Sequence, residues 1–230
     1  MKMAIQSLSI ISTLITISVS LAFAGGVDTG GGTGVRNSVG EMEVLDFVNF
    51  GDKNIISRFS NLNYTVEDQK VIISETLVEK ISLRRLPHYR SMLARLNWWA
   101  KLPDQQDILS KIKYGMDSIQ IQFVDRELNI EEIGDTAFHS GRSYQNDEFE
   151  VLAVYNKNHG VVISRSKFNS LNSYQQETLL FHEVLRELQI GQGYGFTEGA
   201  LQLLTVSLME GPRSDFVDLN ELVQFNSFKK

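Results

Sequence analysis

The chain has 230 residues, a formal net charge of −6, no cysteine and 42% hydrophobic residues. The absence of cysteine excludes a disulfide framework and a lipid-attachment cysteine. The acidic balance argues against nucleic acid as a general partner, because neutralising phosphates requires a basic surface. The length and the hydrophobic content are those of a chain that buries its core as one globular domain.

Residues 1–24 have the pattern of a secretory signal peptide. Lys2 precedes an apolar run from Ile10 to Leu21, and the small-x-small sequence Ala22-Phe23-Ala24 follows it. An uncleaved membrane anchor is the alternative, but the run is shorter than the ~20 residues that span a bilayer and contains several hydroxyl residues. We therefore expect cleavage after Ala24 and export across the inner membrane to the periplasm or the exterior. After cleavage we expect no membrane span.

The segment 25–41 that follows is rich in glycine. A phosphate-binding loop needs a strand before its glycines, a helix after them and a Lys-Ser/Thr pair, and this segment lacks that context. A flexible tether is the expected structure, followed by a single α+β domain over residues 42–230. The alternation of apolar residues from Met42 to Val48 predicts the first strand of that domain.

The rest of the chain alternates between two hydrophobic periods. Apolar residues recur at helical spacing over residues 66–114, with breaks near Pro87 and Pro103, which predicts two or three helices. The period then becomes two, and the final third is helical again. The expected fold is therefore α+β, a small antiparallel sheet with several helices. The strands predicted by the alternation are 118–124, 150–155 and 160–164, of which the last two form a hairpin.

A local basic cluster lies at the start of one predicted helix. Arg84, Arg85 and Arg90 fall close together, with His88 among them and Pro87 marking the helix start. A solvated helix face is the favoured interpretation. The alternative is a binding module for an acidic or cell-wall ligand, which would bind in a salt-sensitive manner.

The residues with the most chemical content form one helix, Leu179-Leu180-Phe181-His182-Glu183-Val184-Leu185-Arg186-Glu187-Leu188. This helix begins like the zinc-protease motif H-E-x-x-H but carries Arg186 in place of the second histidine. A guanidinium is always protonated and cannot donate a lone pair to a metal. On a helical wheel the apolar residues share one face, while His182, Glu183 and Arg186 share the other. The polar face either lines an active-site cleft or is solvated.

Downstream, the sequence Gly195-Phe196-Thr197-Glu198-Gly199-Ala200 resembles the W-x-x-E-G-x-A-like segment of zincin metallopeptidases, whose glutamate is the third zinc ligand. The resemblance implies that His182 and Glu198 bind a metal. It also implies that Glu183 is the general base that takes a proton from the metal-bound water. Thr197 and Glu198 equally fit an ordinary helix N-cap and first-turn acid.

The chain as a whole also resembles a group of small uncharacterised secreted bacterial proteins. These have a signal peptide, a glycine-rich mature start, an early hydrophobic-acidic strand and a late helix that keeps His-Glu and loses the second histidine. The matching features are residues 25–34, 43–47 and 173–183, with the H-E-x-x-R spacing ending at Arg186. This resemblance implies an exported protein with a degenerate zincin-like helix.

The favoured functional hypothesis is a secreted or periplasmic, non-catalytic, zincin-like domain, that is, a pseudo-metallopeptidase with a structural or binding role. In this hypothesis His182, Glu183 and Arg186 form an ion cluster in which Arg186 satisfies a carboxylate. No cofactor is then expected, and the partner would be a component of the envelope or another protein.

The alternative hypothesis is a zinc-dependent hydrolase or peptidase. His182 and Glu198 would then hold zinc, and Glu183 would be the catalytic base. One histidine and one carboxylate bind zinc weakly, so this hypothesis needs a further ligand, such as His139 or His88.

Overall fold

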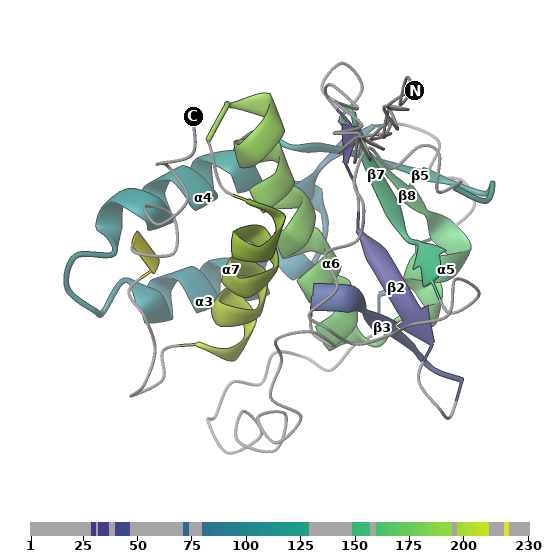
Figure 1. Cartoon of the computed structure of the whole chain (residues 1–230), viewed down its shortest axis with the longest axis horizontal. Coiled ribbons are helices and arrows are strands. Elements are labelled where there is room, and N and C mark those ends of the chain that lie inside the picture. Colours follow the sequence, from purple (N-terminus) through teal and green to yellow (C-terminus); the bar gives the residue numbers. More distant parts are fainter. Residues whose placement is uncertain are drawn as a thin grey trace, which may run out of the picture.

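The computed structural model describes residues 29–30, 32–36, 40–46, 71–73, 80–128, 149–156, 160–194, 197–211 and 219–220. These residues form an α+β fold, which confirms the predicted class. Helix α6 (Ser173–Arg186) runs between two small sheets on one side and the helices α3, α4 and α7 on the other (Figure 1). The predicted signal peptide lies outside the described residues. In the part of the chain that is described, no helix is long and apolar enough to cross a membrane.

The larger sheet has five strands in the order β1-β7-β8-β5-β4. Strands β7 and β8 form the predicted antiparallel hairpin, but the single strand predicted over 150–155 is divided at Leu152 between β6 and β7, which belong to different sheets. Strand β5 pairs with β8 in parallel. The sheet is therefore mixed and not wholly antiparallel, because the chain crosses over between β5 and β8 instead of turning back directly. The strands are β1 (Thr29–Gly30), β4 (Ile81–Ser82), β5 (Gln120–Val124), β7 (Ala153–Asn156) and β8 (Gly160–Ser164).

The smaller sheet places β2 between β3 and β6, and both pairs are antiparallel. Its strands are β2 (Thr33–Arg36), β3 (Met42–Val44) and β6 (Phe149–Val151). Because β1 and β2 fall within residues 25–41, the expectation of a flexible tether does not hold for the described part of that segment. The strand expected from Met42 onwards is present as β3, and the chain turns helical at Leu45 and Asp46.

Gly32 lies where the chain passes from one sheet to the other. Its carbonyl accepts hydrogen bonds from Leu152 N at 3.0 Å and from Ala153 N at 3.2 Å, at the junction between β6 and β7. A Cβ atom at this position would collide with the side chain of Leu179 on α6. Only glycine lets the backbone approach α6 so closely.

The helices follow the predicted breaks. Pro87 directly precedes α3, and Pro103 lies between α3 and α4. Residues 71–73, which were expected to be helical, have no regular secondary structure. Before α7, the Thr197 side chain accepts a hydrogen bond from Ala200 N at 3.3 Å, which confirms the predicted N-cap. The helices besides α6 are η1 (Leu83–Arg85), α3 (His88–Trp99), α4 (Gln106–Ser118), α5 (Arg165–Ser170), the π-helical turn η4 (Glu187–Gly191) and α7 (Glu198–Glu210).

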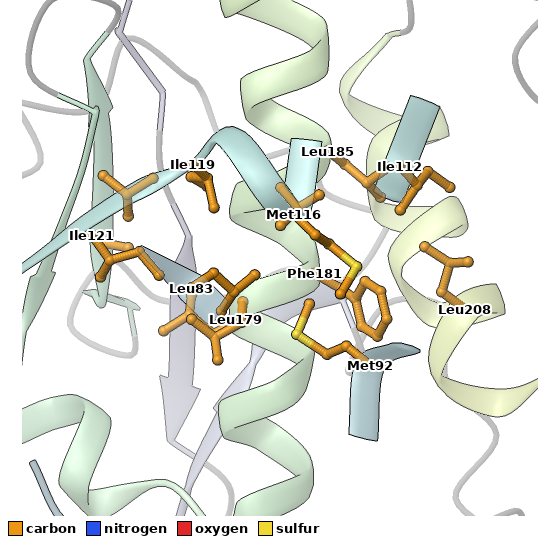
Figure 2. Close-up of a cluster of buried hydrophobic side chains, with 14 of the residues drawn as sticks. Leu83, Met92, Ile112, Met116, Ile119, Ile121, Leu179, Phe181, Leu185 and Leu208 are labelled. Atoms are coloured by element: carbon orange, nitrogen blue, oxygen red, sulfur yellow. The ribbon is translucent and has the colours of Figure 1, made fainter. Parts of the chain in front are cut away.

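Helix α6 is buried on every side, and every residue from Gln175 to Arg186 is buried. Its apolar side chains pack into the main core, where Figure 2 shows Phe181 near Met92 and Met116 and Leu185 near Ile112. The hypothesis of a solvated polar face is therefore wrong. The helical wheel located the apolar face correctly, but strands and helices packed on both sides of α6 also cover its polar face.

We predict that Phe181→Ala lowers the free energy of unfolding by ~3–5 kcal/mol, because it leaves a cavity where a fully buried ring now packs. The control is Tyr114→Ala on α4. Its side chain is 61% exposed, so the free energy should change by no more than ~0.5 kcal/mol. Urea unfolding monitored by circular dichroism measures both. Similar small losses for the two variants would contradict the central position of α6.

Candidate functional site

The three polar residues of the degenerate motif lie together on the buried C-terminal half of α6. His182, Glu183 and Arg186 are 2%, 0% and 3% exposed. His182 and Arg186 are one helical turn apart, so their side chains lie on the same side of the helix. A group of ionisable residues with this burial must find its partners within the protein.

Asp46 supplies the partner of His182. Its Oδ2 atom is 2.6 Å from His182 Nδ1, and the two side chains are 1% and 2% exposed. A carboxylate at this distance holds a proton on Nδ1. The other ring nitrogen, Nε2, then faces away from Asp46. Metal-binding histidines are oriented in the same way, with a carboxylate on one ring nitrogen and the metal on the other.

The guanidinium of Arg186 occupies the space next to His182 Nε2. Its Nη2 atom is 3.4 Å from that nitrogen, and its Nη1 atom is 2.6 Å from Glu198 Oε2 at the start of α7. Nη1 also donates to Gln189 Oε1 at 2.7 Å. The structure thus brings His182 and Glu198, the two predicted metal ligands, to the same side chain. What lies between them is a cation of the chain itself.

Glu183 lies beside this cluster, and its carboxyl group is buried without a well-formed hydrogen bond from the described part of the chain. Neither carboxyl oxygen makes a hydrogen bond of good geometry to any described residue, although the backbone of Gly32 lies close enough to favour the charged form. Burial raises the pKa of Glu183, and the positive charges of His182 and Arg186 oppose this only in part. Burial thus disfavours the ionised carboxylate relative to an exposed glutamate.

The pKa of His182 is also raised. Burial disfavours the charged imidazole, but the charge and the hydrogen bond of Asp46 outweigh burial and raise the pKa from 6.5 to about 9. The cluster thus sets His182 and Arg186 against the carboxylates of Asp46 and Glu198. Each basic side chain has a carboxylate within ion-pair distance, as a buried ionic cluster requires.

His88, one of the two histidines proposed as additional metal ligands, does not complete the site. His88 Nε2 is 3.0 Å from the side-chain oxygen of Gln176, and Gln176 precedes His182 by six residues, or ~9 Å along a helix. His139 lies outside the described residues. Within the described ranges, no group of three His, Asp or Glu side chains converges in a way that could hold a metal ion.

The basic cluster at the start of α3 is organised around Asp117. Arg84 Nε donates to Asp117 Oδ1 at 2.8 Å, and the Tyr89 hydroxyl donates to the same oxygen at 2.6 Å. These bonds link η1 and α3 to α4, while Arg85 and Arg90 are exposed. His88 is buried and does not belong to the surface cluster. The arrangement fits the solvated-face interpretation.

Sequence reasoning missed Asp46, the closest partner of His182. The signal was present in the first predicted strand, where the sequence alternation places Asp46 on the same face as Met42 and Val44, although the structure ends that strand at Val44. An acidic residue at an inward-facing position of an alternating strand implies a buried partner for its charge.

We compared the chain with protein-family models, with curated proteins and with solved structures, and found no match in any of the three.

We predict that stability falls as the pH rises from about 6.5 to about 9, because the folded chain keeps the His182 proton over this range and the unfolded chain releases it. The change due to this residue is ~3 kcal/mol. Asp46→Asn should flatten the dependence by about that amount, as measured by urea unfolding at several pH values. In the control Asp107→Asn, which breaks an exposed pair with Lys111, stability should change by less than ~1 kcal/mol and the pH slope should not change. An equal slope in Asp46→Asn and the unmodified protein would contradict the pairing.

We predict that Glu183→Gln stabilises the protein more at about pH 8 than at about pH 5. Because burial raises the pKa of Glu183, the unfolded chain ionises this group at a lower pH than the folded chain does. The unmodified protein therefore loses stability as the pH rises above the ordinary value of a glutamate. The amide of the variant cannot ionise, so the variant does not lose this stability. Thermal unfolding at the two pH values measures it, and a stabilisation that is larger at the lower pH would show that Glu183 is charged in the fold.

Proposed function

We propose that this chain is an exported, non-catalytic, zincin-like domain, a pseudo-metallopeptidase in which the guanidinium of Arg186 takes the place of the metal. The observation that carries the proposal is the position of that guanidinium, 3.4 Å from His182 Nε2 and 2.6 Å from Glu198 Oε2. His182 and Glu198 are the two residues that the resemblance to zincins assigns to the metal. The signal-peptide pattern of residues 1–24 supports export to the periplasm or beyond.

The chemistry of the guanidinium explains how the site holds together without zinc. Arg186 donates hydrogen bonds and cannot accept a coordinate bond, so it pairs with the carboxylate of Glu198 through its charge, while its own charge opposes protonation of the neighbouring His182. It occupies the position from which the second histidine of the motif would bind zinc. One substitution thus removes a ligand and provides a positive charge that pairs with the partly buried carboxylate of Glu198.

The state of Glu183 supports the absence of catalysis. A general base must be ionised and must reach the water that it activates. Glu183 is 0% exposed, and burial raises its pKa, which disfavours the ionised form. Its burial in particular opposes the role that the alternative hypothesis, a zinc-dependent hydrolase, gives to it, because a general base must reach the water.

The cluster has a structural role in this proposal. Asp46 lies two residues after β3, His182 and Arg186 lie on α6, and Glu198 opens α7. The ionic contacts therefore join three parts of the chain that are far apart in sequence. Removing one member of such a buried set leaves an uncompensated charge, which is strongly destabilising.

We predict that the purified chain from residue 25 onward holds no stoichiometric zinc after expression in zinc-containing medium, and that His182→Ala does not change its metal content. Elemental analysis by mass spectrometry measures both. Stoichiometric zinc in the unmodified protein that is lost in His182→Ala would overturn the proposal and favour the hydrolase.

We further predict that Arg186→His gains zinc in stoichiometric amount, because it restores the H-E-x-x-H spacing next to Glu198. The matched control is Arg186→Gln, which also removes the guanidinium but adds no imidazole, and it should gain none. If Arg186→His keeps its fold by circular dichroism and binds no more zinc than the control, then His182 and Glu198 are not arranged as zincin ligands.

A further inference from the structure

Two side-chain amides beside the start of α6 hold the backbone of the segment Val71–Ile73. Val71 N donates to Gln176 Oε1 at 3.2 Å, and Gln176 Nε2 donates to Val71 O at 3.0 Å. In the same way, Ile73 N donates to Asn169 Oδ1 at 2.9 Å, and Asn169 Nδ2 donates to Ile73 O at 3.1 Å. Each amide thus satisfies both backbone groups of one residue.

This pattern is the one that a neighbouring β-strand would provide. In an extended chain, residues i and i+2 present their N–H and C=O groups on the same edge, and an antiparallel neighbour bonds both groups of each. The carboxamides of Asn169 and Gln176 replace the peptide groups of that neighbour. Because they contact only backbone atoms of Val71 and Ile73, these bonds do not depend on which side chains the segment carries.

Gln176 is fixed in the orientation that this role needs. It is 0% exposed, its Nε2 atom also donates to Phe168 O at 3.0 Å, and its Oε1 atom also lies 3.0 Å from His88 Nε2. Because the carbonyl groups of Val71 and Phe168 both face Gln176 Nε2, the nitrogen and oxygen of this amide cannot be exchanged. The group facing His88 is therefore the oxygen, and His88 Nε2 donates the hydrogen bond to it. Both donors and both acceptor sites of Gln176 are used, and the amide is preorganised for the segment.

The side chains of the bound segment show which residues fit. Ile73 is 6% exposed and belongs to the main core, whereas Ile72 is 64% exposed and points away. Val71 is partly buried against the same core. The site therefore takes an extended backbone with branched apolar side chains at the first and third positions and tolerates any side chain at the middle one.

We propose that Asn169 and Gln176 form a peptide-backbone clamp, a binding site for an extended apolar polypeptide, and that Val71–Ile73 is its resident occupant. A segment of another protein binds the clamp by displacing this occupant, as in the addition of a strand to a sheet edge. The inference rests on the proposed function only for the idea that the domain binds a partner. It does not depend on the metal content of the His182 cluster.

The resident segment is tethered, so it competes at an effective concentration of the order of millimolar. The test must therefore either weaken the resident segment or add peptide at a comparable concentration. The probe is a synthetic peptide of residues 68–76, which contains the Val71–Ile73 sequence. The matched control is the same peptide with N-methyl groups on the Val71 and Ile73 nitrogens, which keeps the side chains and removes the two donors.

The first experiment uses the variant Val71→Pro with Ile73→Pro, whose prolines cannot donate to either amide. We expect this variant to bind the probe in a fluorescence anisotropy titration and to bind the methylated control at least ~10-fold more weakly, since two hydrogen bonds are lost. Adding Asn169→Leu should weaken probe binding by a similar factor. No binding to the folded variant, or equal binding of probe and control, would overturn the proposal.

The second experiment needs no substitution and remains decisive if the proline variant does not fold. Hydrogen exchange of the Val71 and Ile73 amides in the unmodified protein is followed by NMR with millimolar probe or control. We expect faster exchange of both amides with the probe alone, because it displaces the resident segment. An exchange rate that neither peptide changes, or that both change equally, would overturn the proposal. Neither result bears on zinc binding, so failure of the clamp and failure of the proposed function are distinguishable.

Discussion

The complete burial of α6 is the constraint on which the rest of the structure depends. Twelve consecutive residues, Gln175–Arg186, are buried, and seven of them are polar or charged. A polar group in this setting costs free energy unless it is paired, so other parts of the chain must supply a partner for almost every one. The packing of the N-terminal segment and of α3 and α7 against α6 follows from this requirement.

The partners come from distant parts of the sequence. Gln175 Oε1 accepts from Val44 N at 2.6 Å, and Glu177 Oε2 accepts from Arg95 Nε at 2.8 Å in a pair whose side chains are 3% and 11% exposed. Arg95 also donates to the carbonyl of Met209 at 2.7 Å. Each contact specifies where one segment must lie against α6. Such buried polar contacts contribute less to stability than to the choice of a single arrangement.

The cluster around His182 follows the same rule with ionised groups. Asp46 orients the imidazole, and Arg186 lies between it and Glu198. Metal sites use a carboxylate in the same way, to orient a histidine towards its metal. A fold that once required zinc to balance a buried carboxylate could keep its packing if a cation of the chain replaced the metal. In our proposal, Arg186 is that cation, and catalysis is the property that was lost.

Local patterns in the sequence predicted much of the fold. Alternation located β5 and the β7–β8 hairpin, and Pro87 and Pro103 marked the limits of α3 and α4 correctly. The glycine-rich segment was misjudged, because glycine at position 32 serves a close approach to Leu179 that only the three-dimensional structure reveals. A pattern within one segment cannot show which distant segment packs on it.

The same limit applies to the candidate site. The motif identified His182, Glu183, Arg186 and Glu198 from their spacing and from a resemblance, and the structure places all four close together. The wheel could not decide whether their face is solvated or buried, because it describes one helix without its neighbours. Asp46 was missed for the same reason, since it lies 136 residues from its partner His182.

The most direct test of the central claim is the ¹⁵N NMR spectrum of the His182 ring near neutral pH, recorded before and after addition of excess zinc. With Asp46 on one side and Arg186 on the other, we predict that both ring nitrogens carry a proton and that zinc leaves their resonances unchanged. If zinc displaces the proton from Nε2 and shifts its resonance to that of a metal-bound nitrogen, then the space next to His182 is a metal site, and Arg186 does not replace the metal.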